Sequence, residues 1–212
     1  MSIKNALIAL LLTVSAASVA QAEGSYDILF RTGTLDRLEA GAELDYAQAG
    51  STIEEADTGL QDIGLRITVK NEAETYLDMV SADSFRRIGV FPTDVGNPLL
   101  MYALETVVRD ISELTGGSPF YIRNRLKDAI AAETSSEQVS LQFDGTEIAA
   151  SRVTLHPFRN DPNADRIAGL GDLEVSVDVS EAVPGWYHTI STRMPGEGGY
   201  DYSITIAGGD TR

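Results

Sequence analysis

The sequence predicts an α+β fold in which a curved, mostly antiparallel sheet of about nine strands packs on a central helical hairpin. Apolar and polar residues alternate over many short segments on both sides of the middle of the chain, as in strands with one buried face. Between these segments, from about 97 to 132, apolar residues recur at helical spacing. Each element then has one apolar side that needs a partner, so we expect the sheet to curl around the helical pair. A β-sandwich with the helices outside is the alternative.

Residues 1–22 have the three parts of a signal peptide: Lys4, a short apolar stretch, and the small-residue cleavage pattern that ends at Ala22. The apolar stretch is shorter than the roughly 20 residues that cross a bilayer. We therefore expect cleavage near Ala22 and a periplasmic or secreted protein. Residues 23–212 should form one soluble domain.

The clearest strand before the helices runs from Asp62 to Lys70, where Ile63, Leu65, Ile67 and Val69 lie on one side. Shorter candidates are 26–32, 42–46 and 75–81. In the middle of the chain, Asn97-Pro98 suits a helix start and Gly116-Gly117 suits its end, and a second helix should begin at Ser118-Pro119.

The strands after the helices begin at Val139, and Asp144-Gly145 predicts a type I′ hairpin turn because both residues tolerate positive φ. The returning strand changes phase at Ser151-Arg152, which predicts a bulge. Further strands are expected at 173–179, 186–194 and 200–206. In the segment 186–194, alternation puts Trp186, His188 and Ile190 on one face.

The charge balance is strongly acidic, with 32 Asp and Glu against 16 Lys and Arg and a net charge of −16. Nucleic acids and anionic membranes reward clustered cations, so neither is an expected partner. There is no cysteine for a disulfide, and no other stretch is long or apolar enough to span a membrane.

Catalytic motifs are missing from the sequence. It has two histidines, His156 and His188, no Gly-x-Ser-x-Gly elbow and no Ser-x-x-Lys pair. A hydrolase of an envelope polymer that works through paired carboxylates remains open, but 32 acids do not single out a pair. We expect no cofactor and favour a protein without enzymatic activity.

One segment partly matches a calcium loop, because Asp161, Asn163 and Asp165 have the spacing of its first three ligands. Arg166 stands where such a loop needs glycine, and Asp172 replaces the usual bidentate glutamate. An ordinary turn rich in Asn, Asp and Pro is therefore the favoured interpretation.

Two groups of residues are candidate binding sites. Arg123, Arg125 and Lys127 make a cationic patch on the second helix, which could hold an anion or dock an envelope protein, or could be a solvated face. The other group could line an apolar groove between sheet and helices: Phe143, Trp186, His188, Tyr200 and Tyr202.

The arrangement of a sheet curled around helices resembles that of periplasmic lipoprotein carriers at the level of fold. We therefore expect an apolar small molecule, a lipid or a partner segment in the groove, with a structural or protein-interaction component of the envelope as a further alternative.

Overall fold

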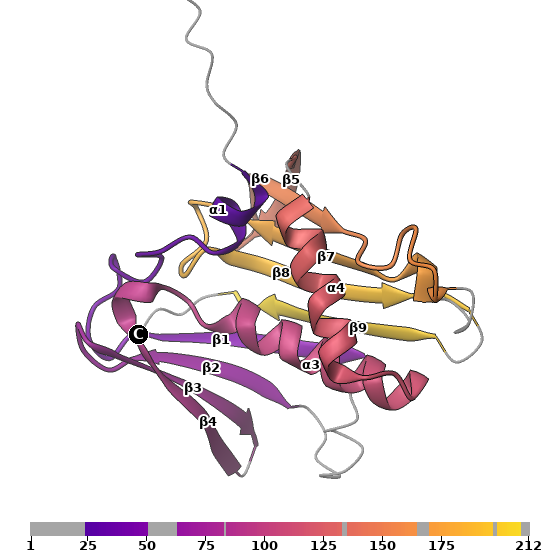
Figure 1. Ribbon diagram of the computed structural model, residues 1–212. Helices are drawn as coiled ribbons and strands as arrows, with labels where there is room; N and C mark the ends of the chain where they lie inside the picture. Colours follow the sequence, from indigo (N-terminus) through magenta and orange to yellow (C-terminus); the bar gives the residue numbers. More distant parts are fainter. Residues whose placement is uncertain are drawn as a thin grey trace, which may run out of the picture.

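The nine strands of the described residues belong to one open, antiparallel sheet, and the helices lie against one of its faces (Figure 1). The computed structural model describes residues 24–50, 63–82, 84–132, 135–164, 170–196 and 199–208. The predicted signal peptide, residues 1–22, lies outside these ranges. Within them, no helix combines the length and the apolar character that crossing a membrane requires.

The strand order is β4-β3-β2-β1-β9-β8-β7-β6-β5. The first and last strands are thus neighbours near the centre, and the two halves of the chain extend from them to opposite edges. The strands are β1 (Glu43–Gly50), β2 (Gly64–Val69), β3 (Glu74–Ser81), β4 (Ser84–Pro92), β5 (Glu137–Phe143), β6 (Thr146–Leu155), β7 (Glu174–Val179), β8 (Tyr187–Met194) and β9 (Tyr200–Ile206). Because all of them form one sheet, the α+β prediction is confirmed and the β-sandwich is not formed.

This topology explains why the helical hairpin covers the sheet. Strand β4 is one edge and β5 is the other, and the chain between them contains α3 (Leu99–Thr115) and α4 (Pro119–Ala132). A connection between opposite edges has to cross a face of the sheet, and Figure 1 shows both helices in front of the strands. Short 3₁₀ turns, Thr93–Val95 and Leu170–Asp172, precede α3 and β7.

The core lies between the sheet and the hairpin. It is formed by alternate strand residues such as Leu65, Ile67 and Val177 and by one side of α3. These side chains are almost completely buried, as expected for strands with a single apolar face. Helix α4 contributes fewer buried residues than α3 does: Ile122, Leu126 and Ile130.

The predicted helix and turn signals are confirmed. The Asn97 carboxamide oxygen accepts a hydrogen bond from the Leu99 N–H at 2.9 Å, and Gly116 ends α3 with a φ of 66°. Asp144 and Gly145 have φ values of 48° and 71°, and they join β5 to β6 as a two-residue turn.

One predicted strand was wrong, and one strand of the sheet was not predicted. Residues 26–32 do not form a strand, because Ser25–Leu29 is a short helix, α1, in which the adjacent Ile28 and Leu29 are both buried. A strand would send those neighbours to opposite faces. Strand β4, by contrast, was not predicted, because it is an edge strand held by backbone pairing with β3 and its exposed side chains do not alternate.

The predicted bulge at Ser151-Arg152 is also wrong, since β6 pairs with β5 and β7 without a shift of register. Register shifts lie instead between Asp178 and Val179, opposite the start of β8, and between Leu77 and Asp78, where β3 pairs with β4. There Tyr187 is buried and His188 is partly exposed. The alternation predicted for 186–194 therefore holds only from Ile190 onward.

Candidate functional site

An apolar groove of about 270 Å³ lies on the side of the helical layer that faces solvent. Its floor is built from Leu104 and Val108 of α3 and from Leu126 and Ile130 of α4. Helix α1 and the residue after it close one end with two aromatic rings, Tyr26 and Phe30, whose centroids are 5.1 Å apart. The groove is thus formed by three helices, and the sheet takes no part in its lining.

The spacing of residues along both helices explains why a groove forms here. The α3 residues of the groove lie three, four and seven positions after Met101, at Leu104, Glu105 and Val108. The same spacing on α4 places Arg123, Leu126, Lys127 and Ile130 on one side of that helix. Helix α3 also buries a second set of apolar residues against the sheet. Its apolar surface is therefore wider than its contact with the sheet requires.

Large apolar side chains remain accessible around this groove. Tyr26 is 61% exposed and Met101 is 52% exposed, although both line the groove. Leu114 and Phe120, near the turn between the two helices, are also strongly exposed, but they do not line the groove. Exposed apolar groups that gather around a hollow, instead of lying singly, are typical of a binding surface.

Charged side chains stand at the rim of the groove. The Arg123 guanidinium donates two hydrogen bonds to the Glu105 carboxylate, at 2.9 and 2.7 Å. This pairing lowers the pKa of Glu105 and raises the pKa of Arg123. Lys127 also lines the groove, and it has no ion-pair partner within the described ranges. Its ammonium group is thus available at the mouth of an apolar hollow.

The predicted cationic patch is divided between two sides of α4. Arg123 and Lys127 lie at the groove, whereas Arg125 forms an ion pair with Asp128 at 2.6 Å and lies 3.6 Å from the Asp161 carboxylate. Residues two apart on a helix do not share a face, which accounts for the division. The three cations therefore do not form one site.

The calcium prediction falls on residues with other contacts. The Asp161 carboxylate accepts hydrogen bonds from the Tyr121 hydroxyl at 2.5 Å and from the Asn163 N–H at 2.8 Å. Asp165 lies outside the described residues. Among the residues that are described, no three acidic or histidine side chains come together as metal ligands. Asp161 thus closes a turn and ties it to α4.

Two of the predicted groove residues, Tyr200 and Tyr202, are buried in the core. The Tyr200 hydroxyl donates a hydrogen bond to the buried Asp110 of α3 at 2.9 Å, and the Tyr202 hydroxyl donates one to Gln48 at 2.6 Å. Burial, together with the nearby Asp110 carboxylate, raises the pKa of Tyr200. These two tyrosines connect helix and strands in the core.

His188 and Phe143 lie together at the start of β8 and the end of β5, with ring centroids 6.3 Å apart. One histidine nitrogen, Nε2, lies 3.1 Å from the Gln142 carbonyl oxygen and so donates a hydrogen bond to it. The other, Nδ1, lies 2.9 Å from the Thr189 hydroxyl. Both ring nitrogens are therefore occupied by structural contacts.

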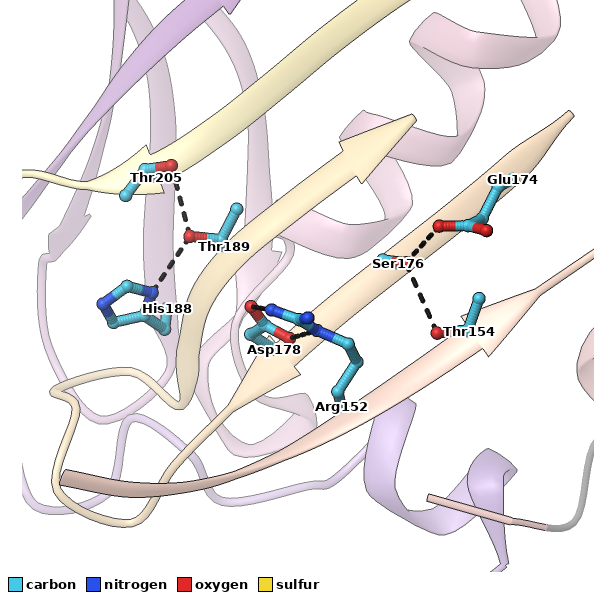
Figure 2. Close-up of polar contacts among 8 residues, drawn as sticks. All are labelled: Arg152, Thr154, Glu174, Ser176, Asp178, His188, Thr189 and Thr205. Atoms are coloured by element: carbon cyan, nitrogen blue, oxygen red, sulfur yellow. Dashed lines mark hydrogen bonds and ion pairs between the residues drawn. The ribbon is translucent and has the colours of Figure 1, made fainter. Parts of the chain in front are cut away.

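Figure 2 shows His188 in a row of polar side chains that crosses neighbouring strands. Thr189 also contacts Thr205 at 3.2 Å, and Arg152 donates two hydrogen bonds to Asp178, at 2.6 and 2.7 Å. Asp178 alternates along β7 with core valines, so this row faces away from the helices.

Three aspartates of the strands are each paired with an arginine. Asp45, Asp78 and Asp178 each accept two hydrogen bonds from an arginine on the adjacent strand. Each carboxylate thus pairs with an arginine and links two neighbouring strands. The carboxylate-dependent hydrolase remains a prediction that these contacts do not support.

The sequence contained a signal for the groove, but the predicted site was placed between the strands and the helices instead. Met101 and Leu104 extend the apolar pattern of α3 beyond the face that contacts the sheet, and Tyr26 was assigned to a strand. Predicting the groove therefore required recognising that residues 25–29 form a helix. Neither a protein-family model nor a curated protein matches the sequence, so the geometry of the groove is the basis for a function.

Proposed function

We propose that the chain is an exported binding protein without enzymatic activity, and that the groove between α3 and α4 receives the apolar chain of a small amphiphile with an acidic head group. The observation that carries the proposal is the groove itself, which has an apolar floor, exposed apolar walls and Lys127 at its rim. Ligand sites in proteins are mostly apolar hollows with a few well-placed polar groups.

The size of the groove limits the ligand. Its volume of about 270 Å³ equals roughly nine groups of the size of a water molecule, each of which occupies ~30 Å³. A methylene group is of similar size, so a single chain of about ten carbon atoms fits. A two-chain lipid would leave most of its apolar surface in water.

The expected affinity is moderate because the groove is open on one side. Burying one methylene contributes about 0.8 kcal/mol, so a ten-carbon chain that is half covered gains about 4 kcal/mol. This corresponds to a dissociation constant of about 1 mM. A charge-assisted hydrogen bond from Lys127 strengthens binding further, into the submillimolar range.

Lys127 is the reason for proposing an acidic head group. Arg123 is already paired with Glu105, whereas the Lys127 ammonium has no carboxylate partner within the described ranges. The chain as a whole is strongly acidic, so it repels anions except near such a cation. An acidic head group therefore binds only if it reaches Lys127.

The test is a calorimetric titration of the full chain with decanoate, kept below the concentration at which decanoate forms micelles. Met101→Glu places a carboxylate in the groove and should abolish binding. Leu114→Glu is the matched control, because Leu114 is equally exposed on the same helix and does not line the groove. This control should bind decanoate as the unchanged chain does.

The contribution of the head group is tested separately. Lys127→Ala should weaken decanoate binding by roughly tenfold, the equivalent of one charge-assisted hydrogen bond. Lys70→Ala makes the same change of charge at an exposed residue just after β2 and should leave the affinity unchanged. If the unchanged chain does not bind decanoate, or if Met101→Glu and Leu114→Glu weaken binding equally, the proposal is wrong.

A further inference from the structure

A second hollow, of about 400 Å³, lies at the end of the sheet where two connections meet. One connection runs from α1 to β1 and contributes residues 31–34 and 36–38, and the other joins β7 to β8 and contributes residues 180–186. Figure 1 shows the chain after α1 and the β7–β8 connection on the same side of the molecule. The α3–α4 groove shares none of these residues.

Two arginines of this hollow converge on one carboxylate. The Arg31 guanidinium lies 2.5 Å from one Glu181 oxygen, and the Arg37 guanidinium lies 3.6 Å from the other. Each oxygen of the carboxylate thus faces its own cation. Two guanidinium groups so placed attract a carboxylate, and here the chain's own glutamate occupies the position between them.

Trp186 fixes the position of Arg31. The guanidinium carbon lies 4.4 Å from the centre of the Trp186 ring, and the indole N–H donates a hydrogen bond to the Ile28 carbonyl at 2.8 Å. Trp186 has a φ of 82°, a left-handed conformation that is strained for an aromatic residue. Such strain persists where the surrounding structure requires that placement of a side chain.

We infer that this hollow binds a small polar molecule through a carboxylate, and that Glu181 holds the carboxylate position until the ligand replaces it. The three charged side chains all remain partly exposed, so the contacts of Glu181 are screened by solvent and exchange readily. The rest of the lining mixes polar and apolar groups, among them Thr32, Val183 and the ring of Trp186. A polar ligand body suits this lining better than an alkyl chain does.

The experiment uses the tryptophan as a reporter, because Trp186 is the only one in the chain. The indole N–H signal of the ¹⁵N-labelled full chain is followed during titration with D-glucuronate. Glucuronate should shift this signal, whereas neutral D-glucose and the apolar carboxylate hexanoate should not. Equal shifts with glucose would show that the carboxylate is not recognised and would overturn the inference.

Glu181→Gln removes the internal competitor and should lower the dissociation constant for glucuronate by roughly fivefold, as expected when a solvent-screened pair worth up to about 1 kcal/mol no longer occupies the site. Glu39→Gln is the control, since it makes the same change of charge nearby and Glu39 lies outside this hollow. If both variants bind equally, general repulsion explains the gain and the inference is wrong.

Arg31→Lys keeps the positive charge but loses the planar group that lies over Trp186. It should weaken glucuronate binding by roughly tenfold while leaving the thermal unfolding midpoint close to that of the unchanged chain. Unchanged affinity in this variant would also contradict the inference. Arg31 does not line the α3–α4 groove, so Arg31→Lys should leave decanoate binding there unchanged, and this separates the two sites.

Discussion

The contact between Tyr200 and Asp110 should be among the most important polar contacts for stability. Asp110 is completely buried on α3, where it accepts hydrogen bonds from the Tyr200 hydroxyl at 2.9 Å and from Arg109 Nε at 3.1 Å. Tyr200→Phe removes one donor and leaves a buried carboxylate with less compensation. A hydrogen bond to a charged group contributes about 1.5–3 kcal/mol.

Tyr187→Phe is the matched control, because the Tyr187 hydroxyl is equally buried but donates to a neutral acceptor, the Leu29 carbonyl, at 2.6 Å. Tyr187→Phe should lower the free energy of unfolding less than Tyr200→Phe does, by about 0.5–1.5 kcal/mol. Urea unfolding measures both, and a loss of about 2 kcal/mol lowers the melting temperature by roughly 4–8 °C in a domain of this size.

A double-mutant cycle completes this test. Asp110→Asn removes the charge, so Tyr200→Phe should cost less in that background than in the unchanged chain. If Tyr200→Phe costs no more than Tyr187→Phe, or if its cost is the same with and without Asp110, the buried carboxylate does not depend on the tyrosine and the reasoning is refuted.

Three further changes have expected outcomes. Burial raises the pKa of Tyr46, Tyr187 and Tyr200 above that of an unfolded tyrosine, which is about 10. Above about pH 10 the unfolded chain therefore loses these protons more readily than the folded chain does. The free energy of unfolding should then fall by up to about 1.4 kcal/mol per pH unit for each of the three tyrosines. A flat urea midpoint between pH 9.5 and 11 would contradict this. Gly145→Ala should lower the free energy of unfolding by roughly 1–2 kcal/mol because of its positive φ alone. Gly185→Ala should lower it more, because the new Cβ would lie 2.4 Å from a side-chain atom of the buried Leu44. Equal urea midpoints for the two variants would be evidence against this contact. Phe120→Ser should change stability by less than about 0.5 kcal/mol in thermal melts, because Phe120 is 70% exposed.

The sequence predicted those elements whose one buried face imposes a period. Strand β2 shows this well, since the predicted apolar residues Leu65, Ile67 and Val69 are all buried. Strand β4 has no such face, and pairing with β3 through backbone hydrogen bonds leaves no pattern in its side chains. The number of strands came out right only because the missing β4 was offset by a false strand at 26–32.

The candidate site was harder to predict for a related reason. Alternation shows that Tyr200 and Tyr202 point toward the helices, but it does not show whether a hollow or a filled core lies there. A groove depends on which helices become neighbours, and α1 and α4 are separated by about ninety residues of sequence. Only the positions of α1, α3 and α4 in space bring Tyr26 to Lys127.

The two sides of α3 should respond differently to substitution, and this difference tests whether the groove is needed for folding. Leu100 is 1% exposed and packs in the core, so Leu100→Ala should cost about 2–5 kcal/mol. Its neighbour Met101 lines the groove and is 52% exposed, so Met101→Gln should change stability by less than about 0.5 kcal/mol. Urea unfolding of both variants decides the matter. A large loss for Met101→Gln would mean that the groove side chains are part of the core, and the apolar surface of α3 would then need no ligand to explain it.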